Sequence, residues 1–165
     1  MLATPHMAAG AAIGKLLRKP SLAYPAAFAS HFLLDRVPHL DSHRLFGRAT
    51  AGVTTGEVTM AAIDTVAGIA LVFWASREQP LRRVILGAAL FGILIDLIDN
   101  VPPWGDWFSA WPGTAWLSTF HHAFQHNVAR DQWLLGFGTQ IAVVAVSLWV
   151  LRAWTGGRAA AKSHD

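Results

Sequence analysis

The chain lacks cysteine, and it has few charged residues. Because none of its 165 residues is a cysteine, disulfide bonds and thiolate metal ligands are excluded. Only 14% of the residues are charged, whereas soluble domains average about 25%. Hydrophobic residues make up 53% of the chain. This balance predicts an integral membrane protein whose main partner is the lipid bilayer.

The formal net charge of +3 does not indicate nucleic-acid binding. Lysine and arginine lie in short clusters beside apolar runs, as expected where loops face the cytoplasm. Charges that merely solubilise the loops would give the same clusters. We therefore expect no nucleic-acid partner.

The apolar residues fall into runs long enough for helices. These runs cover residues 5–17, 21–34, 58–75, 84–98 and 134–151. Because a full crossing takes about 20 residues, the first two runs span only marginally and could form a hairpin packed on the others. A short histidine-bearing helix is expected over residues 114–129. We predict an all-α membrane bundle of four to five membrane-embedded helices, as one domain over 1–154 with a disordered tail over 155–165.

Lysine and arginine also predict a topology. The loops after the first, third and fifth runs carry basic clusters, which can all face the cytoplasm if the chain starts outside. Four arginines then fall on the outer side and weaken the assignment, namely Arg36, Arg44, Arg48 and Arg130. In this topology every cluster of histidines and acids reaches the same membrane edge, opposite the basic loops.

Most histidines and several acids gather at the ends of apolar runs. The clusters are His31, Asp35, His39, Asp41 and His43; Asp96 and Asp99; and His121, His122 and His126. Ionisable groups are costly to bury in such places, so they usually have a partner or a function. Imidazole and carboxylate suit divalent ions such as Zn²⁺ or Mn²⁺. The clusters therefore predict a metal site.

Residue spacing favours chelation, because side chains three or four apart share one helix face. The pairs with this spacing are His31 with Asp35, Asp96 with Asp99, and His122 with His126. We predict these six residues as metal ligands. Further candidate ligands are His6, His39, Asp41 and His121. Taken singly, each pair also fits a hydrogen bond at a helix end or an exposed interfacial segment.

Two more acids lie within or beside the third apolar run. Glu57 and Asp64 are seven residues apart on one helix face. They are expected either to orient metal-binding histidines or to serve as structural acids. A short repeat points to the same region, because residues 33–38 and 97–102 both read as helix ends that carry an Asp three residues before a Pro.

Part of the sequence resembles a known family. Thr4-Pro5-His6 and the run Ser-His-Phe-Leu-Leu-Asp-Arg-Val-Pro-His-Leu-Asp at 30–41 are similar to segments of small bacterial inner-membrane proteins classed as metal-dependent hydrolases. That group includes LexA-binding, membrane-associated hydrolases. The chain departs from the family in its Leu-Pro-Asp-x-Asp element, and only a fragment of a second histidine motif remains at residues 42–44. The resemblance implies a bacterial inner-membrane location and metal-dependent hydrolysis.

Together these observations predict a membrane-bound, metal-dependent hydrolase of a phosphoester or lipid-linked substrate at the membrane surface. One alternative is a non-enzymatic protein that transports or senses a metal ion or a proton. Transport predicts polar residues near the bilayer midplane, and only Asp64 and Gln140 come near that depth. A second alternative is a structural membrane protein whose polar helix ends serve folding alone.

Overall fold

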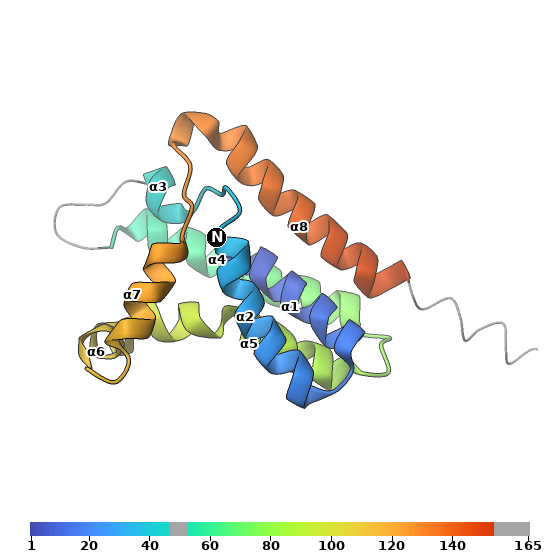
Figure 1. Cartoon of the computed structure of the whole chain (residues 1–165). Coiled ribbons are helices and arrows are strands. Elements are labelled where there is room, and N and C mark those ends of the chain that lie inside the picture. The colour runs from blue at the N-terminus through green and yellow to red at the C-terminus, as the bar shows by residue number, and fades with distance from the viewer. Residues whose placement is uncertain (47–52, 154–165) are drawn as a thin grey trace, which may run out of the picture.

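The computed structural model describes residues 1–46 and 53–153, and these residues are helical apart from connecting loops (Figure 1). The predicted tail over 155–165 lies outside the described residues. The helices are α1 (Ala3–Leu17), α2 (Pro20–Asp35), α3 (Ser42–Phe46), α4 (Thr55–Ser76), α5 (Arg82–Asp99), α6 (Trp104–Ala110), α7 (Ala115–Phe124), the 3₁₀ turn η1 (Arg130–Gln132) and α8 (Trp133–Ala153).

Each of the five apolar runs forms one long helix, which confirms the all-α prediction for the described residues. The break between α1 and α2 follows from local chemistry. Arg18 takes a left-handed conformation with φ of 62°, and Pro20 begins the next helix at a position where its missing N–H costs nothing. The short helices α3 and α6 were not expected, because their segments read as polar or Pro-rich loops.

Helix α1 lies in the centre of the bundle and contacts α2, α4, α5 and α8. Its approach to α5 depends on glycine. A Cβ atom at Gly92 would lie 2.5 Å from the carbonyl oxygen of His6, and one at Gly10 would lie 2.5 Å from that of Ala88. Small residues therefore let the two backbones touch. The surrounding core includes Met7, Ala11, Val72, Ile85, Ile93 and Leu151.

Two described helical segments, Thr55–Ser76 and Arg130–Ala153, are long and apolar enough to cross a membrane. A third span results if α5 and α6, which meet at 78°, are counted together. Ile63 and Val66 on α4 and Ile141 and Val146 on α8 are exposed, as lipid-facing residues would be. With 15 and 16 residues, α1 and α2 are shorter than a full crossing requires.

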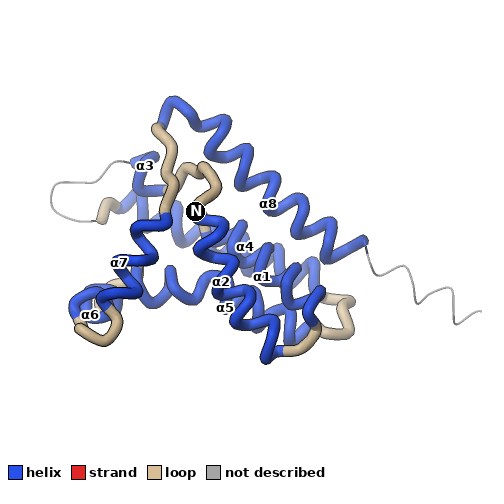
Figure 2. The backbone as a smooth tube through the Cα atoms, viewed as in Figure 1, coloured by secondary structure: helices blue, strands red, loops and turns tan. Residues whose placement is uncertain are grey.

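The two ends of the bundle differ in chemistry. At one end, the Lys15 ammonium and the Gln79 amide both donate to the carbonyl oxygen of Leu151, near the end of α8. The loops after α1 and α4 lie together there (Figure 2). At the other end, Asp35 and Asp99 are the last residues of α2 and α5. The acids and histidines predicted to meet lie at this second end, which we call the acidic end.

Candidate metal centre

The end of α2 supplies the first two side chains of the centre. His31 and Asp35 are one turn apart, and the His31 Nε2 atom lies 3.2 Å from Asp35 Oδ2. The other ring nitrogen of His31, Nδ1, donates a hydrogen bond of 2.8 Å to the carbonyl oxygen of Gly92 on α5. Both side chains are fully buried, so their orientation is fixed by the packing of α2 on α5.

Helix α5 contributes carboxylates from its last turn. Asp96 Oδ1 lies 3.6 Å from His31 Nε2 and 3.4 Å from His121 Nε2. Asp99 stands on the far side of the His121 ring, where its Oδ2 accepts a 2.8 Å hydrogen bond from His121 Nδ1. A carboxylate behind an imidazole sets the tautomer and raises the basicity of the opposite nitrogen. Asp99 therefore orients His121, while Asp96 faces the centre.

His121 comes from α7 and completes the group. It shares a helix face with Leu117 and Phe124, which pack against the apolar cluster around Phe32. This packing turns the His121 ring inward, and its side chain is fully buried. Its Nε2 atom lies 3.2 Å from His31 Nε2 and 3.6 Å from Asp35 Oδ2.

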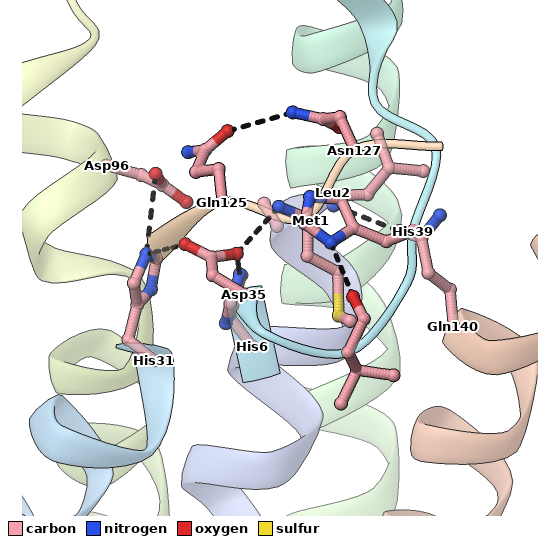
Figure 3. Close-up of polar contacts among 12 residues, drawn as sticks. Met1, Leu2, His6, His31, Asp35, His39, Asp96, Gln125, Asn127 and Gln140 are labelled. Carbon is pink, nitrogen blue, oxygen red and sulfur yellow. Dashed lines mark hydrogen bonds and ion pairs between the residues drawn. The ribbon is translucent and has the colours of Figure 1, made fainter. Parts of the chain in front are cut away.

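Donor atoms of four side chains come close together: Nε2 of His31 and Nε2 of His121 each lie within 3.6 Å of both Oδ2 of Asp35 and Oδ1 of Asp96. His31, Asp35 and His121 could hold one ion, and their donor atoms are 3.2 to 3.6 Å apart. A tetrahedral ion with ligands at about 2.1 Å separates its donors by about 3.4 Å. In Figure 3 the His31, Asp35 and Asp96 side chains point toward one another. The spacing of the triad therefore suits three ligands of a tetrahedral divalent ion, with Asp96 beside both imidazoles.

The hydrogen bonds of the two imidazoles strengthen this interpretation. His31 and His121 each use Nδ1 as a donor, to Gly92 and to Asp99 respectively. Both Nε2 atoms are then left with lone pairs, and they face each other across 3.2 Å. Two lone pairs at that distance repel unless a cation lies between them. The arrangement calls for either a proton or a metal ion.

Charge in the centre agrees with this requirement. Burial alone lowers the pKa of His121, but its contacts with Asp35, Asp96 and Asp99 outweigh burial and raise that pKa to about 10. Burial also raises the pKa of Asp35, yet the imidazoles of His121, His31 and His6 hold it well below its ordinary value. The raised pKa of His121 favours a proton there when no metal ion is bound, and this proton would compensate the charge of Asp35.

His6 and the chain's first residue contact the other oxygen of Asp35. The rings of His6 and His31 stack with centroids 3.9 Å apart, and His6 Nε2 lies 3.2 Å from Asp35 Oδ1. The Met1 amine donates to the same oxygen at 2.8 Å. His6 Nδ1 is buried without a hydrogen-bond partner among the described residues. His6 is close enough to join His31 and Asp96 around one ion.

His122 and Asp99 form a more open extension of the centre. His122 Nε2 lies 3.3 Å from Asp99 Oδ2, and its side chain is 54% exposed. Asp99, His121 and His122 could hold an ion together. This group shares the His121 ring with the buried centre, so the two groups belong to one site that runs from the core to the surface.

The predicted pairing of His122 with His126 on one helix is wrong. Helix α7 ends at Phe124, and the next residues are extended. The amide of His126 donates to the carbonyl oxygen of Asp35 at 2.8 Å, and the amide of His39 donates to that of His126 at 3.1 Å. His126 is exposed and belongs to none of the candidate metal groups among the described residues.

Two loop candidates have local partners instead. His39 is fully buried, and its Nδ1 donates to the carbonyl oxygen of Val37 at 2.8 Å. Asp41 Oδ1 accepts a 3.0 Å hydrogen bond from the amide of Arg44, which is the role of a residue that caps a helix. Asp41 therefore starts α3, and neither residue belongs to a candidate metal group in the described parts of the chain.

Glu57 and Asp64 act at helix starts rather than on the metal-facing histidines. Glu57 forms a reciprocal cap with Thr54 at the start of α4 and lies 2.9 Å from Nδ1 of His43. Asp64 accepts the amide protons of Ala3 and Thr4 at 2.6 and 3.2 Å. A carboxylate at a helix N-terminus is favourable, so Asp64 fixes the start of α1, on which His6 lies.

The structure thus brings together five of the six predicted ligands, His31, Asp35, Asp96, Asp99 and His122, and adds His6 and His121 from the further candidates. The sequence carries a signal for the inward orientation of His121. Leu117, His121 and Phe124 are spaced by four and three residues, the pattern of one buried helix face. That pattern favours His121 over its neighbour His122 as the inward-facing histidine.

Comparison with known proteins gives no relative: no family model, curated protein or solved structure matches this chain. The resemblance to membrane-associated hydrolases therefore stays a prediction, and the function has to be argued from the geometry of the centre.

Proposed function

We propose that this protein holds a divalent transition-metal ion, with Zn²⁺ the best fit, between His31, Asp35, Asp96 and His121. The observation that carries the proposal is the 3.2 to 3.6 Å spacing among the donor atoms of His31, Asp35 and His121, with Asp96 Oδ1 3.4 to 3.6 Å from both imidazoles. Mixed imidazole and carboxylate ligands suit Zn²⁺ or Mn²⁺. Tetrahedral geometry favours Zn²⁺ over Mn²⁺.

We further propose that the centre hydrolyses a phosphoester or lipid-linked substrate. A bound divalent ion would polarise a phosphoryl or carbonyl oxygen and acidify water. The chain's residues supply the setting: Asp99 fixes the His121 ring, and His6, stacked on His31, keeps one ring nitrogen unpaired beside the ligands. Asp96 is 21% exposed, so the centre can be reached from the surface.

The surroundings favour a substrate at the membrane surface. Four tryptophans on and around α6 and α7 are between 50% and 65% exposed, namely Trp104, Trp107, Trp111 and Trp116. Tryptophan concentrates at the headgroup level of bilayers, and α7 also carries His121. We propose that the acidic end lies at this level of a bacterial inner membrane, with α1, α2, α4, α5 and α8 membrane-embedded.

Metal content and hydrolysis test the proposal together. The full chain, purified in detergent and dialysed against Zn²⁺, should retain about one ion per chain by elemental analysis. The loaded protein should then hydrolyse an aryl phosphodiester, an aryl phosphomonoester or a short-chain phospholipid. His121→Gln should lose both properties, whereas His43→Gln, at a half-buried position outside the centre, should leave both unchanged.

The possible outcomes separate the candidate functions. Stoichiometric metal without hydrolysis of any of these substrates would overturn the hydrolase and favour metal sensing or transport. Failure of the wild-type chain to retain any divalent ion would overturn the metal centre itself.

A further inference from the structure

A polar groove opens beside the metal centre at the acidic end of the bundle. Its volume is about 480 Å³. Its walls come from the end of α2, from α3, and from α7 with the segment after it: Arg36, Arg44, His122, Gln125, His126 and Asn127. Every one of these side chains can donate a hydrogen bond. None of the residues lining the groove is an acid.

The two arginines of the groove have no acidic partner within residues 1–46 and 53–153. Neither Arg36 nor Arg44 forms an ion pair with a carboxylate of the described residues, in contrast to Arg77, which pairs with Glu78 at 3.0 Å. Arg36 instead stands over the Phe124 ring, with Cζ 5.8 Å from the ring centroid. This contact holds the Arg36 guanidinium on the groove side of α7 while its hydrogen-bond donors stay accessible.

The groove and the metal centre are joined through shared residues. Arg36 directly follows Asp35, and the amide of His126 donates to the carbonyl oxygen of Asp35 at 2.8 Å. His122 lines the groove and also lies 3.3 Å from Asp99 Oδ2. A ligand in the groove would therefore lie next to the carboxylates and imidazoles of the centre.

The donor set of the groove matches a phosphate group. Arginine presents its N–H groups in a planar fork that suits the oxygens of phosphate. Two guanidinium groups with imidazole and amide donors around them favour a multiply charged, oxygen-rich anion over a neutral ester. The carboxylates of the metal centre would repel such an anion, so its binding there needs compensating positive charge at the rim.

We propose that this groove binds the phosphate group of the substrate and presents its ester bond to the metal centre. Arg36 and Arg44 supply the charge, and His122 and His126 supply further hydrogen bonds. This inference rests on the proposed hydrolase function and narrows its substrate class to phosphate esters. The phosphate can belong to a lipid headgroup or to a soluble phosphate ester, and both present the same chemistry to the groove.

Ligand binding to the chelator-treated, full-length protein in detergent tests the groove without the metal. Three probes distinguish the sources: inorganic phosphate, glycerol 3-phosphate and dihexanoyl phosphatidic acid. Titration calorimetry should give a dissociation constant for at least one of them. The variant with both Arg36→Gln and Arg44→Gln should weaken that binding by at least about tenfold, because charge-assisted hydrogen bonds are lost.

A matched control carries the same charge change at the other end of the bundle. The variant with Arg82→Gln and Arg83→Gln removes two positive charges next to the start of α5 and should bind the same probe within about twofold of wild type, because exposed charges far from a site are screened. A lipid headgroup is the source if only phosphatidic acid binds. A soluble phosphate ester is the source if glycerol 3-phosphate binds equally well.

Three results would overturn the proposal that the groove binds phosphate. They are no binding of any probe, unchanged binding in the Arg36 and Arg44 variant, and an equal loss of binding in the control variant. A portion of each preparation, dialysed against Zn²⁺ and analysed for metal, keeps this test apart from that of the metal centre. Full metal uptake with no phosphate binding refutes the phosphate site alone, whereas phosphate binding by a preparation that takes up no Zn²⁺ refutes the metal centre alone.

Discussion

The two ends of the bundle bury polar groups in opposite ways. At the end opposite the acidic end, which we call the basic end, Lys15 and Gln79 both donate to one backbone carbonyl, that of Leu151. At the acidic end, buried side chains face one another, and some keep unpaired atoms. All buried side-chain polar atoms without a hydrogen-bond partner in the described residues lie there: His6 Nδ1, Asp35 Oδ2, His39 Nε2, Asp99 Oδ1 and Asn127 Oδ1.

This difference separates a structural role from a functional one. Native proteins satisfy nearly all buried polar groups, so unpaired ones call for an explanation. At the basic end, buried polar side chains bond to the backbone, and none of their atoms lacks a partner within the described residues. At the acidic end the unpaired Asp35 Oδ2 faces the Nε2 atoms of His31 and His121 at 3.2 and 3.6 Å, and a bound cation would satisfy these three atoms. The contrast can be tested by removing one polar group at a time from each end.

The largest effect is expected for Asp35→Asn. The substitution keeps the shape of a fully buried side chain but removes the negative charge shared by three histidines. We expect Zn²⁺ affinity to fall by at least about a hundredfold, measured by competition with a chromophoric chelator. Asp41→Asn is the matched control, because asparagine also caps helices well. Equal losses in both variants would contradict the assignment of Asp35 as a ligand.

A smaller effect is expected for Asp99→Asn. This side chain holds the His121 ring through its Nδ1 atom, and loss of such an outer carboxylate lowers metal affinity by about ten- to a hundredfold. The same chelator competition measures the change. Metal affinity equal to that of wild type would mean that Asp99 does not orient His121.

The smallest effect is expected at the basic end. Gln79→Leu removes one donor to the Leu151 carbonyl, which keeps Lys15 as a partner. We expect a loss of about 1 kcal/mol in the free energy of unfolding, or about 2–4 °C in thermal denaturation. Zn²⁺ affinity should stay at the wild-type value. A weaker metal site in this variant would break the distinction between the two ends.

Much of the fold could be predicted from the sequence, because hydrophobic runs and helix breakers act locally. The predicted runs differ from the ends of α1, α2, α4, α5 and α8 by at most three residues. The short repeat also identified Asp35 and Asp99 as helix ends, and both are the final residues of their helices. Helix α7 was predicted too long, because the backbone of His126 pairs with α2 and residue 39 rather than with its own turn.

The candidate site was only partly predictable, because spacing within one helix does not say which face turns inward. The convergence of distant clusters on one end followed from the basic loops alone. The choice between the adjacent His121 and His122 did not follow from the basic loops, and it depends on the spacing of Leu117, His121 and Phe124 along one buried face of α7. The capping roles of Asp41 and Asp64 depend on tertiary contacts that a residue pattern cannot express.

Gly92 ties the geometry of the centre to the packing of the fold. Because it has no side chain, the backbone of His6 can pack against it. Its carbonyl oxygen accepts a hydrogen bond from His31 Nδ1. A larger residue there would clash with the His6 backbone and disturb the contact with His31 as well. Because two contacts depend on Gly92, we expect this position to vary little in evolution. The exposed positions of α4 and α8 should vary more.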